Sequence, residues 1–165
     1  MIKKSLSVLL VIVMIATLFT IVPITAAAEE TYTSGDYSYV LVTEDDVTTA
    51  GITAYTGSEA NLTIPDTLDG YPVNVIRQSA FANNTTLTKV TFPDTVSSIG
   101  HYAFQGCTNL EEVTLSDTLE DIGYSSFYNC TALSQIVIPN SVTFIGNYAF
   151  AYCSTLSSVT LSSNL

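Results

Sequence analysis

Residues 99–115, IGHYAFQGCTNLEEVTL, decide the fold, because the same pattern recurs every 23 positions. The next copy is IGYSSFYNCTALSQIVI at residues 122–138, and weaker copies precede and follow these two. The clearest column of the repeat consists of Phe81, Phe104, Phe127 and Phe150. A fixed period of about 20–30 residues with apolar side chains at constant offsets predicts a solenoid of stacked coils. One coil cannot bury its own apolar face, so we expect each column to form an internal ladder.

The two halves of the repeat predict different local structures. The L-x-x-V-x-L half ends with the apolar and polar alternation of a strand, and it stops at Pro93 and Pro139, which cannot donate to a β-ladder. The I-G-x-x-A-F-x-x-C half spaces its apolar residues three and four apart, which favours a short helical, 3-10 or irregular return arm. We expect Gly100, Gly123 and Gly146 to supply the bend between the halves. The predicted fold class is a β-rich solenoid with one parallel strand and one return arm per coil.

The repeat resembles a known family over residues 62–162. Its core, I-G-x-x-A-F-x-x-C-x-x-L, as at residues 99–110, is similar to the BspA-like leucine-rich repeats of bacterial surface and secreted proteins. The lead-in at residues 64–73 resembles the first coil of that family. Departures are mild: Arg77 stands where later units have Gly, and Asn84 where they have Cys. The resemblance implies a parallel strand face and a role in binding or adhesion rather than a reaction.

The N-terminus, residues 1–28, has the composition of a signal peptide. Lys3 and Lys4 precede an almost wholly apolar run, residues 5–22, and residues 26–28 are three alanines that offer a cleavage site. An uncleaved membrane anchor is the alternative, because a run of about 18 apolar residues is just long enough to span a bilayer. Cleavage predicts a secreted or cell-surface protein with no stable membrane insertion.

The rest of the chain is expected to divide into a cap and a solenoid. Residues 29–61 lie outside the repeat but contain two strand-like runs, 37–42 and 51–55, which predict an N-terminal β-hairpin cap over the first coil. Residues 62–165 are predicted to form about four coils. After Ser162 the sequence reads like the start of another unit. This leaves two alternatives: an open last coil that self-associates end to end, or a fragment of a longer protein.

The net charge of the chain limits the classes of partner that it is expected to bind. It carries 4 Lys and Arg against 15 Asp and Glu, a net charge of −11, and loss of Lys3 and Lys4 with the signal would bring this to −13. Such acidity argues against nucleic acid and anionic membrane surfaces as partners. It fits plain solubility, and it also fits attraction to cationic partners or loose binding of Ca²⁺.

Three cysteines share one column of the repeat: Cys107, Cys130 and Cys153. We expect a structural ladder of buried thiols, as for the phenylalanines, although pairing of two of them in a disulfide stays open. Zinc sites need convergent ligands with close Cys-x-x-Cys spacing, which the sequence lacks, so no metal or other cofactor is predicted.

No nucleophile elbow, zinc-protease or phosphate-loop motif occurs, and the single histidine, His101, is expected to be solvated. The chain is therefore predicted not to be an enzyme.

The strand face is the candidate binding surface, because the residues that flank the buried central one on each predicted strand point outward. These candidate ligand-binding residues are Lys89, Thr91, Glu112, Thr114, Gln135, Val137, Ser158 and Thr160. Tyrosines on the return arms add rigid contact area with a polar tip, which suits protein or sugar recognition. These arm tyrosines are Tyr102, Tyr124, Tyr128, Tyr148 and Tyr152. We predict a module that attaches to a protein or glycan ligand; a structural spacer or assembly module, or an accessory domain of a larger extracellular protein or enzyme, is the alternative.

Overall fold

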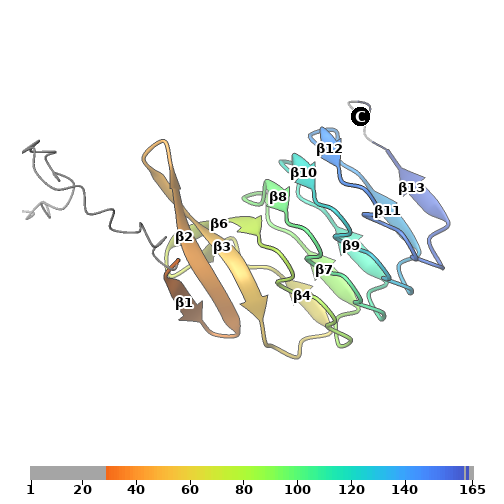
Figure 1. Cartoon of the computed structure of the whole chain (residues 1–165), viewed down its shortest axis with the longest axis horizontal. Coiled ribbons are helices and arrows are strands. Elements are labelled where there is room, and N and C mark those ends of the chain that lie inside the picture. Colours follow the sequence, from red (N-terminus) through yellow and green to blue (C-terminus); the bar gives the residue numbers. More distant parts are fainter. Residues whose placement is uncertain (1–28, 162, 164–165) are drawn as a thin grey trace, which may run out of the picture.

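The computed structural model describes residues 29–161 and 163, which form a β-solenoid of about five coils of roughly 23 residues (Figure 1). No residue of this described part is helical. The predicted fold class is therefore confirmed, with the irregular form of the return arm rather than the helical or 3-10 form. The signal peptide predicted for residues 1–28 lies outside the described residues.

Each of the four coils that begin at residues 73, 96, 119 and 142 contributes one short strand to each of two parallel sets, and the segment before them adds a fifth strand to the first set. The strand face comprises β4 (Asn61–Thr63), β7 (Lys89–Thr91), β9 (Glu112–Thr114), β11 (Gln135–Val137) and β13 (Ser158–Thr160). The second sheet comprises β6 (Tyr71–Ile76), β8 (Ser98–Ile99), β10 (Asp121–Ile122) and β12 (Phe144–Ile145). Pairing keeps the period of the sequence, since Lys89 lies opposite Glu112 and Asp121 opposite Ser98. The pairing register turns every sequence column into a spatial row.

An antiparallel unit precedes the repeats. It consists of β1 (Thr31–Ser34), β2 (Tyr37–Glu44) and β3 (Val47–Tyr55), and β3 then pairs in parallel with β6 and so extends the second sheet. The short strand β5 (Thr67–Leu68) pairs with β6 through a tight turn at Asp69 and Gly70, both of which have positive φ. The sheet that begins in this unit therefore runs on into the coils without an exposed edge between them.

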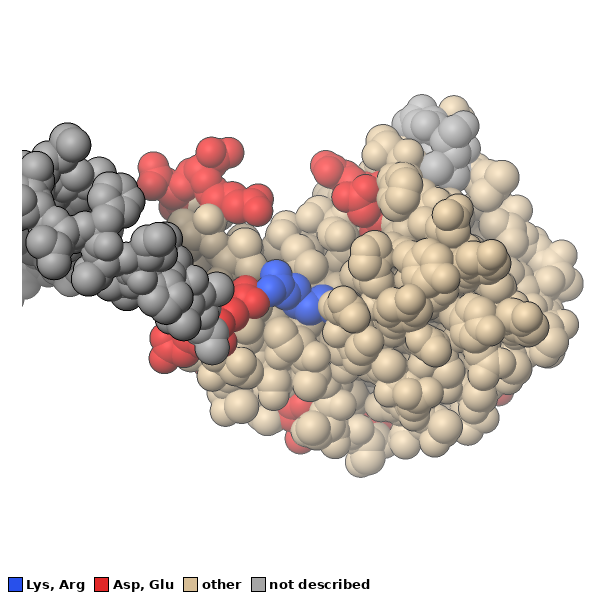
Figure 2. Space-filling model, in the orientation of Figure 1, with Lys and Arg blue, Asp and Glu red and all other residues tan. Residues whose placement is uncertain are grey.

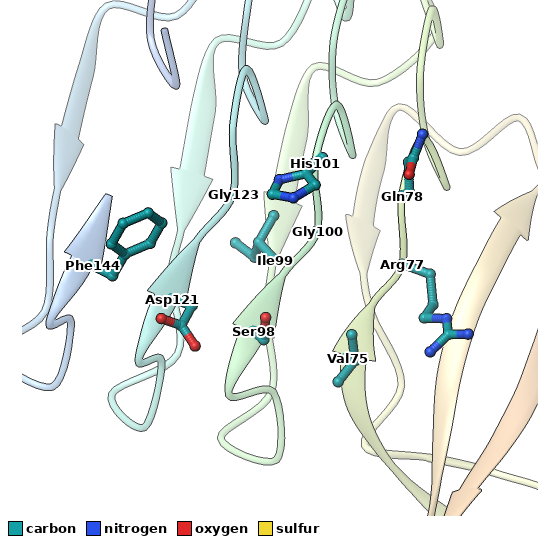
Figure 3. Close-up of a pocket in the computed structure, with 10 residues that line it drawn as sticks. All are labelled: Val75, Arg77, Gln78, Ser98, Ile99, Gly100, His101, Asp121, Gly123 and Phe144. Carbon is teal, nitrogen blue, oxygen red and sulfur yellow. The ribbon is translucent and has the colours of Figure 1, made fainter. Parts of the chain in front are cut away.

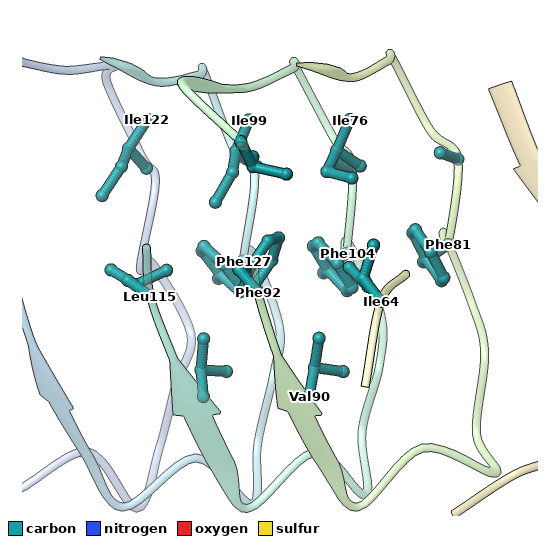
Figure 4. Packing of buried hydrophobic residues seen from close by; sticks show 14 of the residues in the cluster. Ile64, Ile76, Phe81, Val90, Phe92, Ile99, Phe104, Leu115, Ile122 and Phe127 are labelled. Carbon is teal, nitrogen blue, oxygen red and sulfur yellow. The ribbon is translucent and has the colours of Figure 1, made fainter. Parts of the chain in front are cut away.

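The core is a set of stacked rows (Figure 4). Neighbouring rings in the phenylalanine row lie 4.8, 5.3 and 5.5 Å apart and within 8° of parallel. The row continues into the antiparallel unit, because Tyr55 lies 5.3 Å from Phe81 and Tyr37 lies 5.1 Å from Tyr55. One aromatic column thus ties the β2–β3 hairpin to the coils.

The return arms owe their irregular shape to alternating hydrogen bonds. In the arm at residues 100–108, the N–H groups of Tyr102, Phe104 and Gly106 donate to carbonyls of the next coil. The N–H groups of residues 103, 105 and 107 instead donate to carbonyls within their own coil. Positive φ at Tyr102 and Gly106 turns every second N–H outward along the solenoid. A helix would direct all of these groups along its own axis, so it could not join neighbouring coils.

The repeated glycines are needed for the close approach of neighbouring coils and not for the bend that the sequence predicted. None of Gly100, Gly123 and Gly146 has a positive φ; the left-handed positions of the arms are held by serine, tyrosine and asparagine as well as by Gly106. A Cβ on Gly123 would instead stand 2.7 Å from the backbone carbon of Gly100. The glycine column is needed because the backbones of adjacent coils approach too closely there for any side chain.

The cysteines form a ladder that also carries hydrogen bonds. Cys107, Cys130 and Cys153 are all free, and each thiol donates to the carbonyl of the phenylalanine in the preceding coil, at 3.1–3.2 Å. Burial raises the pKa of the Cys107 thiol to about 12 and raises the pKa of the other two thiols as well. The thiols are therefore packing groups that link each coil to the one before it.

Asp69 fastens the antiparallel unit to the first coil. Its carboxylate accepts hydrogen bonds from the hydroxyls of Tyr39, at 2.7 Å, and Ser34, at 2.8 Å. These two bonds lower the pKa of Asp69, with that from Tyr39 the stronger cause, and the bond to Asp69 raises the pKa of Tyr39 to about 12. The buried Tyr39 ring thus has a partner for its polar tip.

Candidate functional site

The strand face places all eight candidate residues on one side of the solenoid. Lys89 and Thr91 on β7 are half-buried, and the other six, on β9, β11 and β13, are exposed. The central residue of each inner strand, Val90, Val113 or Ile136, points into the core. The structure therefore brings together the residues that the sequence placed on this surface, which Figure 1 shows as the row from β4 to β13.

The strand face is split by a seam between β9 and β11. β4, β7 and β9 form one three-stranded sheet, β11 and β13 form another, and no ladder pairs β9 with β11. The N–H of Phe92 donates to Thr114 O, and that of Ile138 to Thr160 O, each at the coil that follows. Within the described residues, Leu115 N at the seam makes no corresponding bond to Val137 O. The seam therefore leaves backbone polar groups of two strands open to a ligand or to water.

The seam opens into a slot with a volume of about 360 Å³. Four of the eight candidate residues line it: Glu112, Thr114, Gln135 and Val137. Its floor is apolar, formed by Val113, Leu115 and Ile136, and Asp117 and Pro139 close one end. A slot with an apolar floor and polar edges is a surface on which a ligand can bury apolar groups while its polar groups are satisfied.

The charges at the slot are few. Lys89 Nζ lies 2.6 Å from Glu112 Oε1, and about half of each side chain is exposed to solvent, so this pair contributes little to stability. Its exposure leaves both charged groups available to a partner. Asp117 adds a second carboxylate at the end of the slot, while Gln135, Thr114 and Val137 keep the rest of the rim uncharged.

A larger hollow lies on the other side of the molecule, between the β2–β3 hairpin and the second sheet (Figure 2). Two adjoining cavities, of about 360 and 600 Å³, share Val75, Arg77, Ser98 and Asp121. Glu44 and Asp45 at the hairpin tip form one wall. Figure 3 shows Val75, Ser98, Asp121 and Phe144 on successive strands, following one another across the second sheet, with the Arg77 side chain beside Val75. This hollow is a second concave surface, with acidic walls and a basic group at its base.

The sequence did not predict this hollow, because one of its walls comes from outside the repeat. Val75, Ser98, Asp121 and Phe144 do share a column, but their chemistry changes at every step, so no conserved pattern marked them. Arg77 is held by an ion pair with Glu29. The signal that could have found the surface is the long β2–β3 hairpin, which overhangs the second sheet.

Among the described residues, neither a cluster of metal-ligating side chains nor a long apolar helix is found. Among residues 29–161 no three His, Cys, Asp or Glu side chains converge closely enough to hold a metal ion. No helix in the described part of the chain is long and apolar enough to cross a membrane.

Comparisons with known proteins agree with this geometry. The model of the BspA-type leucine-rich repeat region matches residues 74–165 in six copies. A leucine-rich repeat protein from Bacteroides capillosus has a solved structure that is 36% identical, with a TM-score of 0.71, and the match covers 80% of this chain and 98% of that one.

Two further solved structures extend the comparison. The T. pallidum leucine-rich repeat protein is 31% identical with a TM-score of 0.66, over 80% of this chain and 72% of that chain. A leucine-rich cell surface protein from Faecalibacterium prausnitzii is 28% identical with a TM-score of 0.55, over 79% of this chain and 54% of that one. No curated protein matches. The chain belongs to the BspA-type leucine-rich repeat family, and the resemblance noted in the sequence is confirmed.

Proposed function

We propose that this chain is a secreted or cell-surface binding module that attaches to a protein or glycan through its strand face, with the seam between β9 and β11 at the centre of the contact. The slot supports this placement, because it is the one part of the strand face among the described residues where backbone groups, an apolar floor and exposed polar side chains meet. The repeat family and its cell-surface neighbour support the extracellular setting.

Binding rather than catalysis is proposed because the surface offers contact area and no activated group. The titratable side chains on the strand face are an exposed ion pair and scattered carboxylates, and neither arrangement activates a nucleophile or a base. An extended solenoid surface is instead suited to recognising an extended partner.

The experiment uses the chain immobilised on a surface and probed with an array of extracellular proteins and glycans. A strand-face variant, with Lys89→Ala, Glu112→Ala and Gln135→Ala combined, should lose the ligand while keeping the melting temperature of the wild type. The matched control replaces three residues of the same coils that line the hollow, Gln78→Ala, Ser98→Ala and Asp121→Ala, and should bind as the wild type does. If the control loses the ligand and the strand-face variant keeps it, the hollow beneath the β2–β3 hairpin is the binding surface instead.

A second role, in end-to-end association, is favoured by the exposed apolar edge of the last described coil. Val159 is 43% exposed and Leu161 62% exposed, whereas Val113 and Leu115 in the same rows are each 8% exposed. Light scattering over a range of protein concentrations tests this role: association that Val159→Asp abolishes supports it, and a concentration-independent monomer removes it.

A further inference from the structure

The surface of the return arms differs in chemistry from the rest of the molecule. Residues 100–108, 123–131 and 146–154, here called the arm surface, contain no Asp, Glu, Lys or Arg, in a chain with 15 acidic residues. They contain five of its ten tyrosines. The arm surface is therefore uncharged and rich in tyrosine, whereas the chain as a whole is strongly acidic.

Backbone geometry fixes where these tyrosines point. Tyr102, Tyr148 and Tyr152 occupy left-handed positions, at φ near 60°, in arms whose backbones are bonded to neighbouring coils. Tyr124 follows a glycine that packs against the preceding coil, and its N–H donates to His101 Nδ1 at 2.9 Å. Side chains on so constrained a backbone lose little conformational entropy when they bind a ligand.

The tyrosine rings contact one another along the solenoid, and Tyr148 and Tyr152 remain mostly exposed while the other three are partly exposed. Tyr124 lies 5.3 Å from Tyr102 and 5.7 Å from Tyr148, with the ring planes near perpendicular in both pairs. Tyr128 and Tyr152 make a further pair at 5.0 Å. The tyrosines thus form a row with a step of about one coil.

A hollow of about 230 Å³ lies within this row. Its lining residues are Tyr102, Gln105, Tyr124, Ser125 and Tyr128. Among the described residues, no hydrogen-bond partner is found for the Gln105 amide or for the hydroxyls of Tyr102 and Tyr124. The hollow therefore combines aromatic faces with free neutral donors and acceptors, and it contains no ionic group.

We propose that the arm surface is a binding site for a neutral oligosaccharide. A pyranose ring with equatorial hydroxyls has a flat apolar face of C–H groups, which stacks on tyrosine, and a polar rim, which bonds to hydroxyl and amide groups. The row of tyrosines along the solenoid matches a linear chain of such rings. An anionic sugar would meet the repulsion of a chain whose net charge is −11, and no basic residue on the arm surface would offset it.

This site is independent of the strand face. The arm surface and the strand face come from different halves of each coil, and they share no residue. Failure of the glycan site would leave the proposed attachment through the strand face untouched, and the reverse also holds.

The test is calorimetric titration of residues 29–165 with cellohexaose and with chitohexaose, two neutral β-linked hexasaccharides. We expect binding to at least one of them. Tyr124→Ala should weaken it about tenfold, because a stacking face and a hydroxyl are lost. Tyr124→Phe, which keeps the face, should weaken it far less. Tyr102→Ala provides a second variant, and the melting temperature of each variant shows whether it folds.

Two controls make the result decisive. The strand-face triple variant should bind the hexasaccharide as tightly as the wild type. The β-1,4-linked hexaglucuronate, which has the rings of cellohexaose with a carboxylate on each, should not bind. The proposal is overturned if neither neutral hexasaccharide binds at millimolar concentration, if folded Tyr124→Ala and Tyr102→Ala variants bind like the wild type, or if the hexaglucuronate binds as well as the neutral sugars.

Discussion

The return arms and the strand face stack the same coils in different ways. Between the second and third coils the arms are joined by three backbone hydrogen bonds, a thiol bond and a stacked phenylalanine pair, whereas β9 and β11 of the strand face are not paired at all. The coils nevertheless stay in register across this seam. The difference teaches that the arms, together with the β8–β10 pairing of the second sheet, hold these coils together, which leaves the strand face free to open and to vary.

The largest expected effect comes from breaking the arm stack at its centre. Phe104→Ala removes a fully buried ring that stacks on two neighbours, and we expect a loss of about 3–5 kcal/mol in the free energy of unfolding. Thr114→Ala, in the same coil but exposed on the strand face, should change this free energy by no more than about 0.5 kcal/mol. Urea titration of both variants measures the difference, and equal losses would contradict the division of roles between the arms and the strand face.

A smaller effect is expected where the arm backbones touch. Gly123→Ala would place a Cβ 2.7 Å from a backbone carbon of the preceding coil, so the coils must separate. Such overpacking costs about 1–3 kcal/mol. Gln105→Ala, on the outer side of the neighbouring arm, serves as the control and should be close to neutral. A Gly123→Ala variant as stable as the wild type would mean that the arms are not tightly stacked.

The cysteine ladder should contribute less per residue. Cys130→Ala removes a buried thiol and its bond to Phe104 O, and we expect a loss of about 1–2 kcal/mol by urea titration. The raised pKa values also predict that Cys107 and Cys130 react with a thiol reagent far more slowly than the less buried Cys153 in the folded protein. All three should react in urea without a reductant; recovery of fewer than three thiols would instead indicate a disulfide.

The smallest expected effect is a dependence of stability on pH at the antiparallel unit. Because the folded-state pKa of Asp69 is lowered, its contribution is present above the ordinary carboxyl pKa and is lost as the pH falls through the lowered one. The raised pKa of Tyr39 acts at the other extreme: its contribution is lost as the pH rises from about 10 toward about 12.

Urea midpoints between about pH 5 and 2 test the acid limb. The fall should be smaller in Asp69→Asn, which lacks the titrating group. Glu112→Gln is the matched control on the strand face, and its urea midpoint at neutral pH should be close to that of the wild type because the ion pair it removes is exposed. An identical fall in Asp69→Asn and the wild type would show that other carboxylates govern acid unfolding.

The 23-residue period was enough to predict the solenoid, because like residues at a fixed offset must stack when pairing is in register. It predicted the inward rows and the outward row of the strand face for the same reason. It could not predict the left-handed arm positions, since Ser79, Tyr102, Ser125 and Tyr148 share that geometry without sharing a residue type. The period also could not predict that Tyr55 extends the phenylalanine column, because Tyr55 precedes Phe81 by 26 rather than 23 residues.

The sequence did not predict the seam or the hollow, for a different reason. The columns on either side of the seam are as regular as elsewhere. Ser116 stands where two other units have Pro93 and Pro139, but Ser162 replaces the proline in the last unit too, so it does not mark the seam. The hollow needs the β2–β3 hairpin, which lies outside the repeat. Periodicity reveals only the features that all coils share. The seam and the hollow could not be predicted from it, because they arise where a single coil or the antiparallel unit differs from the rest.

Amide hydrogen exchange tests the central claim most directly, because it compares the arms with the strand face in one sample. The arms are predicted to be protected throughout, with the amides of Phe104 and Phe127 exchanging only on global unfolding. On the strand face, Phe92 and Ile138 should be protected, whereas Leu115 at the seam should exchange much faster. Protection of Leu115 equal to that of Phe92 and Ile138 would mean that the strand face is continuous, and it would contradict the account.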